Sequence, residues 1–264
     1  MTNWSGGPLN ERVTCRLCAN PGPMTLDGTN TWIISAPGAD EAVVIDPGPL
    51  HEDHLQRVLA DVAERGARVG LVLATHGHLD HAESLDRFSE LTGAPVHGNC
   101  SGAQPIGADE VFEVGGVRIS NVPTPGHTMD SLCFLLEEDG ILFTGDTILG
   151  RGTTVVAHPD GQLAPYLASL ATLGELAGRG EVTTLAPGHG PVVRDAARKV
   201  ADYVAHRRER LEQVRSACRG RAELPRPELA DAVVASVYAD VPRDVWPAAR
   251  QSVLAQLDFL RLGR

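Results

Sequence analysis

The stretch Thr75-His76-Gly77-His78-Leu79-Asp80-His81 decides how the rest of this 264-residue chain is interpreted. It follows an apolar run at residues 71–74 that is typical of a buried strand. Imidazole nitrogens and carboxylate oxygens are both metal ligands, and a rigid sheet positions the side chains of the loops at its strand ends. The stretch therefore predicts a metal-binding loop at the carboxyl end of a strand.

Three more residues of ligand type occur further along the chain in a similar setting. His127, Asp146 and His189 each come shortly after a predicted strand, and each directly follows a glycine that allows a tight turn. The spacing of His76 and His78 lets two rings reach one ion, whereas Asp80 and His81 can serve a second. The sequence thus predicts a metal site that is assembled from several strand ends.

The remaining candidate residues are expected to have structural or supporting roles. The five other histidines are expected to be surface or capping residues: His51, His54, His97, His158 and His206. Asp46, which precedes Pro47-Gly48, is expected to shape a turn or to support a ligand. Thr75, Thr128 and Thr147 flank the ligands and either support them or only end strands. Cys15 and Cys18 form an isolated C-x-x-C pair, for which a metal or redox role is not expected.

The pattern of apolar residues predicts an α+β fold. Strands are expected at residues 31–35, 42–46, 71–74, 111–114, 117–122, 131–137, 141–144 and 182–185. Helices are expected at 51–65, 82–92, 163–176, 194–219, 227–239 and 244–262. Because both signals recur throughout the region before residue 194, we expect two packed sheets with helices outside them.

The charge distribution also changes near residue 194, where we place a domain boundary. Residues 1–204 carry 12 Lys+Arg and 26 Asp+Glu, a net charge of −14, whereas residues 205–264 carry 11 and 8, a net of +3. Residues 1–193 are expected to form the catalytic domain and residues 194–264 a small helical domain. The acidity of the first part opposes non-specific binding to nucleic acid; the basic second part is either an anion-binding face or a solvated helix.

The ordered ligand motifs resemble those of the metallo-beta-lactamase fold superfamily, over about residues 10–195. The resemblance implies a four-layer αβ/βα sandwich with the metals at one edge, between the two sheets. It implies two zinc ions, although iron or manganese is possible. The first zinc would be held by His76, His78 and His127, and the second by Asp80, His81 and His189, with Asp146 bridging both.

The resemblance also implies a hydrolase, in which a hydroxide between the metals attacks a carbonyl carbon or a phosphorus. Asp80 and Asp146 would be its catalytic carboxylates. A bridging carboxylate is typical of the thioester, lactone and phosphodiester hydrolases of the superfamily, so beta-lactam hydrolysis is disfavoured.

A closer resemblance, to the lactamase-beta-like endoribonuclease group, is carried by residues 20–31 and by Gly152-Thr153-Thr154. Residues 228–262 are similar to the winged-helix domain of that group. The chain ends where a β-wing would begin, so the wing is expected to be short or missing.

Three activities follow from the sequence as alternatives. The first is cleavage of single-stranded RNA, and the second is hydrolysis of a small ester, thioester or lactone, as in the glyoxalase-II-like branch. The third is a mononuclear iron dioxygenase with its iron on His76, His78 and His127. A homodimer through the C-terminal region is an open possibility.

The N-terminal sequence, the cysteine content and the hydropathy together predict a cytoplasmic protein without a membrane partner. The N-terminus lacks a signal peptide pattern, five cysteines form no regular framework, and no run of residues is long and apolar enough to span a bilayer.

Overall fold

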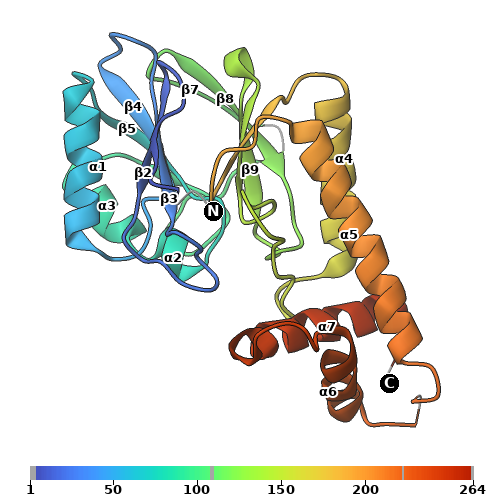
Figure 1. The fold of residues 1–264 in the computed structure, drawn as a ribbon. Helices are drawn as coiled ribbons and strands as arrows, with labels where there is room; N and C mark the ends of the chain where they lie inside the picture. The colour runs from blue at the N-terminus through green and yellow to red at the C-terminus, as the bar shows by residue number, and fades with distance from the viewer. Residues whose placement is uncertain (1–3, 108–109, 222, 263–264) are drawn as a thin grey trace.

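The protein consists of two β-sheets packed face to face, with helices on both outer faces (Figure 1). The computed structural model describes residues 4–107, 110–221 and 223–262. The first sheet has the strand order β1 (Gly7–Pro8), β2 (Val13–Leu17), β3 (Asn30–Ile34), β4 (Glu41–Ile45), β5 (Arg68–Leu73) and β6 (Val96–His97). The second has the order β11 (Thr184–Pro187), β10 (Ile141–Gly145), β9 (Leu132–Leu136), β8 (Val117–Pro123) and β7 (Val111–Val114).

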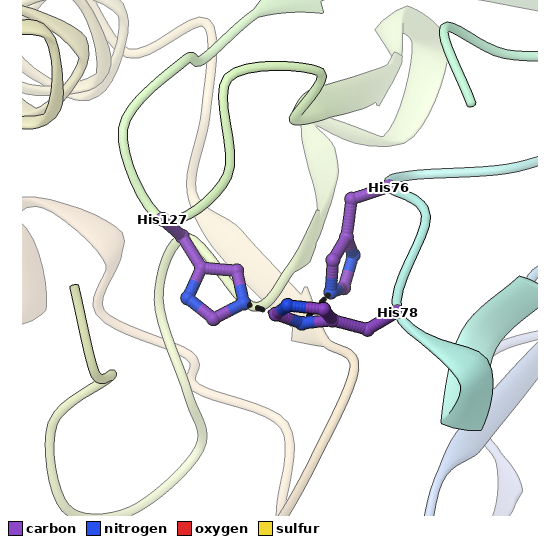
Figure 2. A group of neighbouring side chains, drawn as sticks. All are labelled: His76, His78 and His127. Atoms are coloured by element: carbon purple, nitrogen blue, oxygen red, sulfur yellow. Dashed lines mark hydrogen bonds between the residues drawn. The ribbon is translucent and has the colours of Figure 1, made fainter. Parts of the chain in front are cut away.

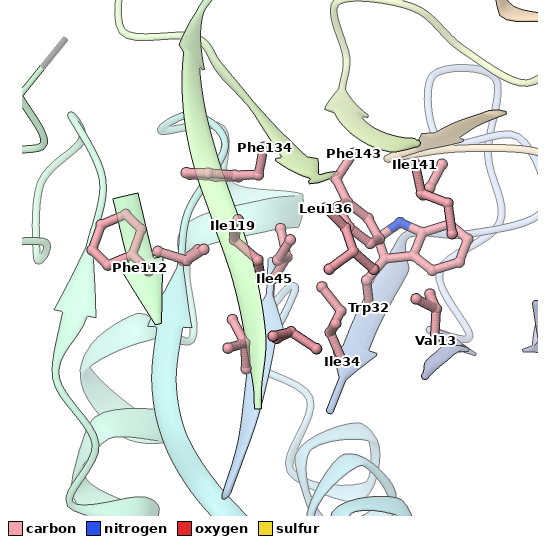
Figure 3. Close-up of a cluster of buried hydrophobic side chains, with 14 of the residues drawn as sticks. Val13, Trp32, Ile34, Ile45, Phe112, Ile119, Phe134, Leu136, Ile141 and Phe143 are labelled. Carbon is pink, nitrogen blue, oxygen red and sulfur yellow. The ribbon is translucent and has the colours of Figure 1, made fainter. Parts of the chain in front are cut away.

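The main core lies between the two sheets (Figure 3). Side chains alternate across a strand, so Phe134 of β9 points into this core while Leu135 points to the opposite face. Trp32 and Phe143 meet across the sheets with their ring centroids 5.6 Å apart. Large buried side chains therefore fix the distance between the sheets on which the site depends.

Helices cover the two outer faces. Against the first sheet pack α1 (Glu52–Glu64) and α3 (Leu85–Thr92), which bury Leu55 and Phe88. Against the second pack α4 (Leu163–Gly178) and the first half of α5 (Ala196–Ala217), which bury Leu170 and Tyr203. The predicted α+β, four-layer αβ/βα architecture is confirmed.

Each sheet contains a pair of parallel strands, and their direction determines which edge of the sheet carries the loops of the site. β4 runs parallel to β5 in one sheet, and β10 runs parallel to β11 in the other. Carboxyl ends of parallel neighbours meet at one edge of a sheet, so four strand ends can face one another. A backbone hydrogen bond of 2.8 Å from Asn30 N to Gly188 O joins the two sheets near this edge.

The C-terminal helices form a separate apolar cluster. The second half of α5 packs with α6 (Arg226–Val237) and α7 (Trp246–Leu260), which follows the short helix η2 (Arg243–Val245). Residues 223–262 contain no strand, and the chain end expected to lack a wing lies partly outside the described residues. Residues of α5 belong to both apolar clusters, and the helix runs from beside α4 to the C-terminal helices (Figure 1). A boundary at residues 193/194 therefore stays a prediction.

Most predicted elements are found within a few residues, with one difference close to the metal-binding motif. The helix expected at residues 82–92 is two helices, α2 (Leu79–Ala82) and α3, because Ser84 leaves the helical conformation and its hydroxyl donates to Gly48 O at 2.8 Å. The β9–β10 hairpin contains the short helix η1 (Glu137–Asp139) before Gly140. Within the described part of the chain, no helix has the length and apolar character needed to cross a bilayer.

Candidate metal centre

All seven predicted ligand residues lie together at the edge between the two sheets. They form three overlapping groups whose ligand atoms lie within 4.8 Å of one another. These groups are His76, His78 and His127; His76, His81 and Asp146; and Asp80, His81 and His189. His76 follows β5, Asp146 follows β10, and His189 follows β11, so the parallel strand ends supply three of the seven.

In the first group, three imidazole rings converge on one point (Figure 2). The Nδ1–H of His127 donates to Val155 O at 2.7 Å, and that of His76 donates to Thr75 Oγ1 at 3.0 Å. Both rings therefore direct an Nε2 lone pair inward, 3.1 and 3.0 Å from the Nδ1 of His78. His78 has at most one proton on that atom, so it cannot donate to both rings, whereas one metal ion can accept all three lone pairs.

In the group formed by Asp80, His81 and His189, two lone pairs point at each other. His81 donates its Nδ1–H to Asp46 Oδ2 at 2.8 Å, and His189 donates its Nδ1–H to Gly28 O at 3.1 Å. Their Nε2 atoms then lie 3.1 Å apart, and Asp80 Oδ2 lies 3.1 Å from the Nε2 of His189. Such an arrangement requires a shared cation, which is either a proton or a metal ion.

Asp146 lies between the group of His76, His78 and His127 and the group of Asp80, His81 and His189. Its Oδ1 is 3.4 Å from the Nε2 atoms of both His81 and His189, and its Oδ2 is 3.8 Å from that of His127. Oδ1 is buried and has no hydrogen-bond partner among the described residues. An orphaned, buried carboxylate oxygen facing imidazole lone pairs fits a bound cation.

Burial and the neighbouring charged groups also shift the pKa values of His76 and His81. Burial lowers the pKa of His76 well below its usual value, and the neighbouring His81 and His127 lower it further. Burial also opposes the charged form of His81, but Asp146 and Asp46 outweigh it and raise the pKa of that ring well above its usual value. The carboxylates of Asp146 and Asp46 thus favour positive charge at His81.

Asp46 is a supporting residue whose role the sequence left open. Its carboxylate accepts hydrogen bonds from Thr75 N at 2.8 Å, from Thr75 Oγ1 at 2.7 Å and from His81 Nδ1 at 2.8 Å. Since Thr75 Oγ1 also accepts from His76, one carboxylate orients a ring of each group. Asp46 holds a left-handed φ of 51°, which Asp and Asn tolerate better than most residues.

Two glycines allow the close packing of the ligand loops. A Cβ at Gly188 would lie 2.6 Å from Cε1 of His81 and 2.8 Å from Asp146 Oδ1. A Cβ at Gly145 would lie 2.5 Å from Thr75 Oγ1, and Gly145 has a φ of 46°. Gly188 is therefore required by contact, and Gly145 both by contact and by its left-handed backbone.

The expectation for His54 was wrong. His54 is buried, with its Nε2 2.9 Å from Thr31 Oγ1, which in turn donates to Asp46 O at 2.7 Å. The sequence pattern placed His54 on a helix, four residues before the apolar Val58, and the packing of α1 on the sheet buries this face. Of the flanking threonines, Thr75 contacts a ligand, whereas the hydroxyls of Thr128 and Thr147 bond to Ser131 and Thr124.

Two packed sheets between helices, with clusters of His and Asp side chains at their common edge, define a protein of the αβ/βα class with a candidate metal centre. The comparisons with known proteins identify the family. The model of the metallo-beta-lactamase superfamily matches residues 24–99 and 101–190, and that of the beta-lactamase associated winged helix domain matches residues 230–261. The chain belongs to the metallo-beta-lactamase superfamily.

Individual relatives cover nearly the whole chain. The atrochrysone carboxyl ACP thioesterase of Aspergillus chevalieri is 34% identical over 94% of this chain and 80% of its own length. The beta-lactamase-like protein 2 homolog of Caenorhabditis elegans is 31% identical over 93% of this chain and 82% of its own length. Other relatives are longer, and the chain spans only 62% of one of them.

Among solved structures, a metallo-beta-lactamase family protein from Thermus thermophilus has a TM-score of 0.77. It is 21% identical and covers 96% of this chain and 94% of its own. At this identity the likeness concerns the fold alone.

Proposed function

We propose that the protein is a binuclear zinc hydrolase whose substrate is a thioester. The observation that carries the metal part is the convergence of imidazole lone pairs and the orphaned Oδ1 of Asp146, which together require positive charge at two adjacent points. The thioester part rests on the relative named as a carboxyl ACP thioesterase, which matches this chain over both of its parts.

The residues present fit two ions. His76, His78 and His127 would hold the first, Asp80, His81 and His189 the second, and Asp146 both. A divalent metal bound there lowers the pKa of a coordinated water towards about 7 and polarises the substrate carbonyl. Iron or manganese suits the same donor types, so zinc is the proposal that metal analysis must test.

Asp80 is the carboxylate of the cluster that reaches solvent. Its side chain is 28% exposed, against 11% for Asp146 and 0% for His81 and His189. We assign Asp80 the orientation of the attacking water, because its free oxygen can accept a hydrogen bond from it. In the reaction the water oxygen bonds to the carbonyl carbon, the C–S bond breaks, and a proton from the water goes to the leaving sulfur.

Charge and apolar surface favour a thioester over RNA. The region up to residue 204 has a net charge of −14, which repels a polyanion. Leu79, between His78 and Asp80, and Met129, two residues after His127, are 70% and 42% exposed and offer apolar contact to an acyl chain. Cleavage of single-stranded RNA remains the second candidate, since a winged helix domain model matches residues 230–261.

The test combines metal analysis with turnover. Two zinc ions per chain and hydrolysis of acyl thioesters are expected, with a loss of at least about a hundredfold in kcat/KM in Asp80→Ala. The control is Asp53→Asn, which changes an exposed carboxylate on α1 and should leave kcat/KM unchanged.

Each other outcome contradicts a named part of the proposal. One iron per chain with oxygen consumption would replace the hydrolase by a dioxygenase. Cleavage of unstructured RNA that disappears in Asp80→Ala, without thioester turnover, would replace the substrate. Thioester turnover that survives in Asp80→Ala would place the reaction elsewhere.

A further inference from the structure

A cleft of about 280 Å³ opens beside the metal centre, between the loop at residues 153–155 and the C-terminal helices. Its lining includes Met24, Val155, Arg207, Arg210, Tyr238 and Ala248. We call it the α5–α7 cleft. No Asp or Glu is among its lining residues, although the chain as a whole is strongly acidic.

Arg207 is the unusual residue of this cleft. It is 4% exposed, it donates to the backbone oxygen of Thr154, and its Nε has no partner among the described residues. No carboxylate of the described chain forms an ion pair with it, and its guanidinium lies 5.1 Å from the ring centroid of Tyr166. A buried cation without a counter-ion is costly, and this one lines an opening.

A second arginine adds to the positive character of the same cleft. Arg210 is stacked 4.5 Å from the ring centroid of Tyr238 and donates to Val237 O at 3.0 Å, which holds its charge at the cleft wall. His206 also lines the cleft, and its pKa is lowered by burial and by the charges of both arginines. The cleft therefore attracts a negative group.

The loop at residues 153–155 contacts both Arg207 and His127, a proposed ligand of the metal centre. Thr154 O accepts from Arg207, while Thr154 Oγ1 lies 3.2 Å from His127 Nδ1, and Val155 O accepts from the same atom. One short segment thus separates the cleft from the cluster.

We propose that the α5–α7 cleft binds a carboxylate or phosphate group of the substrate whose carbonyl carbon reacts at the metal centre. This proposal deepens the proposed thioester hydrolysis and rests on it. The negative group pairs with Arg207 and Arg210, and Met24 and Val155 contact the apolar portion. The C-terminal helices then act in substrate selection.

The test uses non-hydrolysable thioether analogues and calorimetry on the full chain. One analogue carries a terminal carboxylate on its acyl part, one carries a phosphate on its thiol part, and one is neutral. At least one charged analogue should bind about tenfold to a hundredfold more tightly than the neutral one. Whichever does so identifies the source of the negative group, and equal binding of all three overturns the proposal.

Two variants and a control assign the effect to the cleft. Arg207→Met removes the buried charge, and Ala248→Phe fills the cleft with Arg207 in place. Each should abolish the preference for the charged analogue, whereas Arg208→Gln, at an exposed neighbour on α5, should retain it. A preference that survives in a folded Ala248→Phe protein contradicts the proposal even if Arg207→Met fails to fold.

Turnover separates this proposal from the one on which it rests. The corresponding thioesters are assayed in parallel with the binding experiment. Selective binding without hydrolysis would refute the proposed function and leave the binding site, whereas hydrolysis without selectivity would do the reverse.

Discussion

At the scale of single residues, the metal centre depends on groups that hold the ligands in one tautomer. Asp46 is the central example, because its two oxygens fix Thr75 and His81 and, through Thr75, His76. The rings of His76 and His81 are thereby held in one orientation and one tautomer, with Nε2 directed towards the metal position. The precision of the site is therefore set by residues that do not contact the metal position.

Asp46→Asn should weaken metal binding by about tenfold to a hundredfold. Asn tolerates the left-handed backbone of this position, but its amide donor would face the donors of Thr75 or His81. Competition with a chromophoric chelator measures the affinity. Asp53→Asn, on the exposed face of α1, serves as control, and an unchanged affinity in Asp46→Asn would contradict the role given to this carboxylate.

Because His54 is buried, the fold should lose stability at acidic pH. Burial, together with the charges of Arg16, His51 and Arg57, lowers its pKa to about 4, with Asp61 opposing. The unfolded chain takes up a proton below about pH 6.5 and the folded chain only near pH 4, so this contribution to stability falls as the pH decreases between these values. Between pH 7.5 and 5 the loss should be about 2 kcal/mol.

Urea unfolding with a chelator present measures this effect. The difference in the free energy of unfolding between pH 7.5 and 5 should be smaller in His54→Gln than in the parent chain by that amount. The comparison is needed because other buried histidines titrate in the same range. Equal pH dependence of both proteins would show that His54 is accessible to protons.

At the scale of elements, the ligands are brought together by strand direction and tight packing of the loops that follow. Gly126, before His127, shows how little space the loop has. A Cβ there would lie 2.3 Å from the Cα of Tyr166 in the first turn of α4, and its φ is 142°. The His127 loop and α4 are thus in backbone contact.

Gly126→Ala should destabilise the fold by about 2–4 kcal/mol and weaken metal binding as well, because the loop must move away from α4. Gly178→Ala, at the last residue of α4, is the control, because the added methyl there meets no atom of another element within 4 Å. That change should stabilise the protein by about 0.5–1 kcal/mol. Thermal unfolding of both variants gives the comparison, and equal melting temperatures would contradict it.

At the scale of the whole molecule, α5 links the catalytic sandwich to the C-terminal helices. Tyr203 is buried against α4 and accepts a 2.8 Å hydrogen bond from Leu149 N, three residues after Asp146. Four residues later than Tyr203, Arg207 lines the α5–α7 cleft. One helix therefore covers the second sheet and shapes the cleft beside the metal centre.

A chain that ends at residue 193 should not unfold cooperatively. It would expose the apolar face of α4 and leave Leu149 N without a partner, at about 1.5–3 kcal/mol for each large side chain uncovered, against a total stability of about 5–15 kcal/mol. A chain that ends at residue 219 keeps α5 and should retain a cooperative transition. Circular dichroism during heating tests both, and a sharp transition in the shorter chain would support a boundary at residues 193/194.

The sequence by itself determined the fold class and the set of ligand-type residues. Apolar periodicity is local, and each metal-ligand motif carries its own glycine, so His76, His127, Asp146 and His189 could be found without knowledge of their neighbours. The positive charge of the C-terminal region was also visible, although not what it faces.

Only the tertiary structure decided which polar residues work together. Asp46 and Thr75 are joined by strand pairing, His54 by the packing of α1, and Arg207 by the docking of α5 on residues 153–155. These relations depend on contacts between segments far apart in the chain, and no local pattern records them. The sequence names the ligands, and the packing determines which residues orient them and what lines the adjoining cleft.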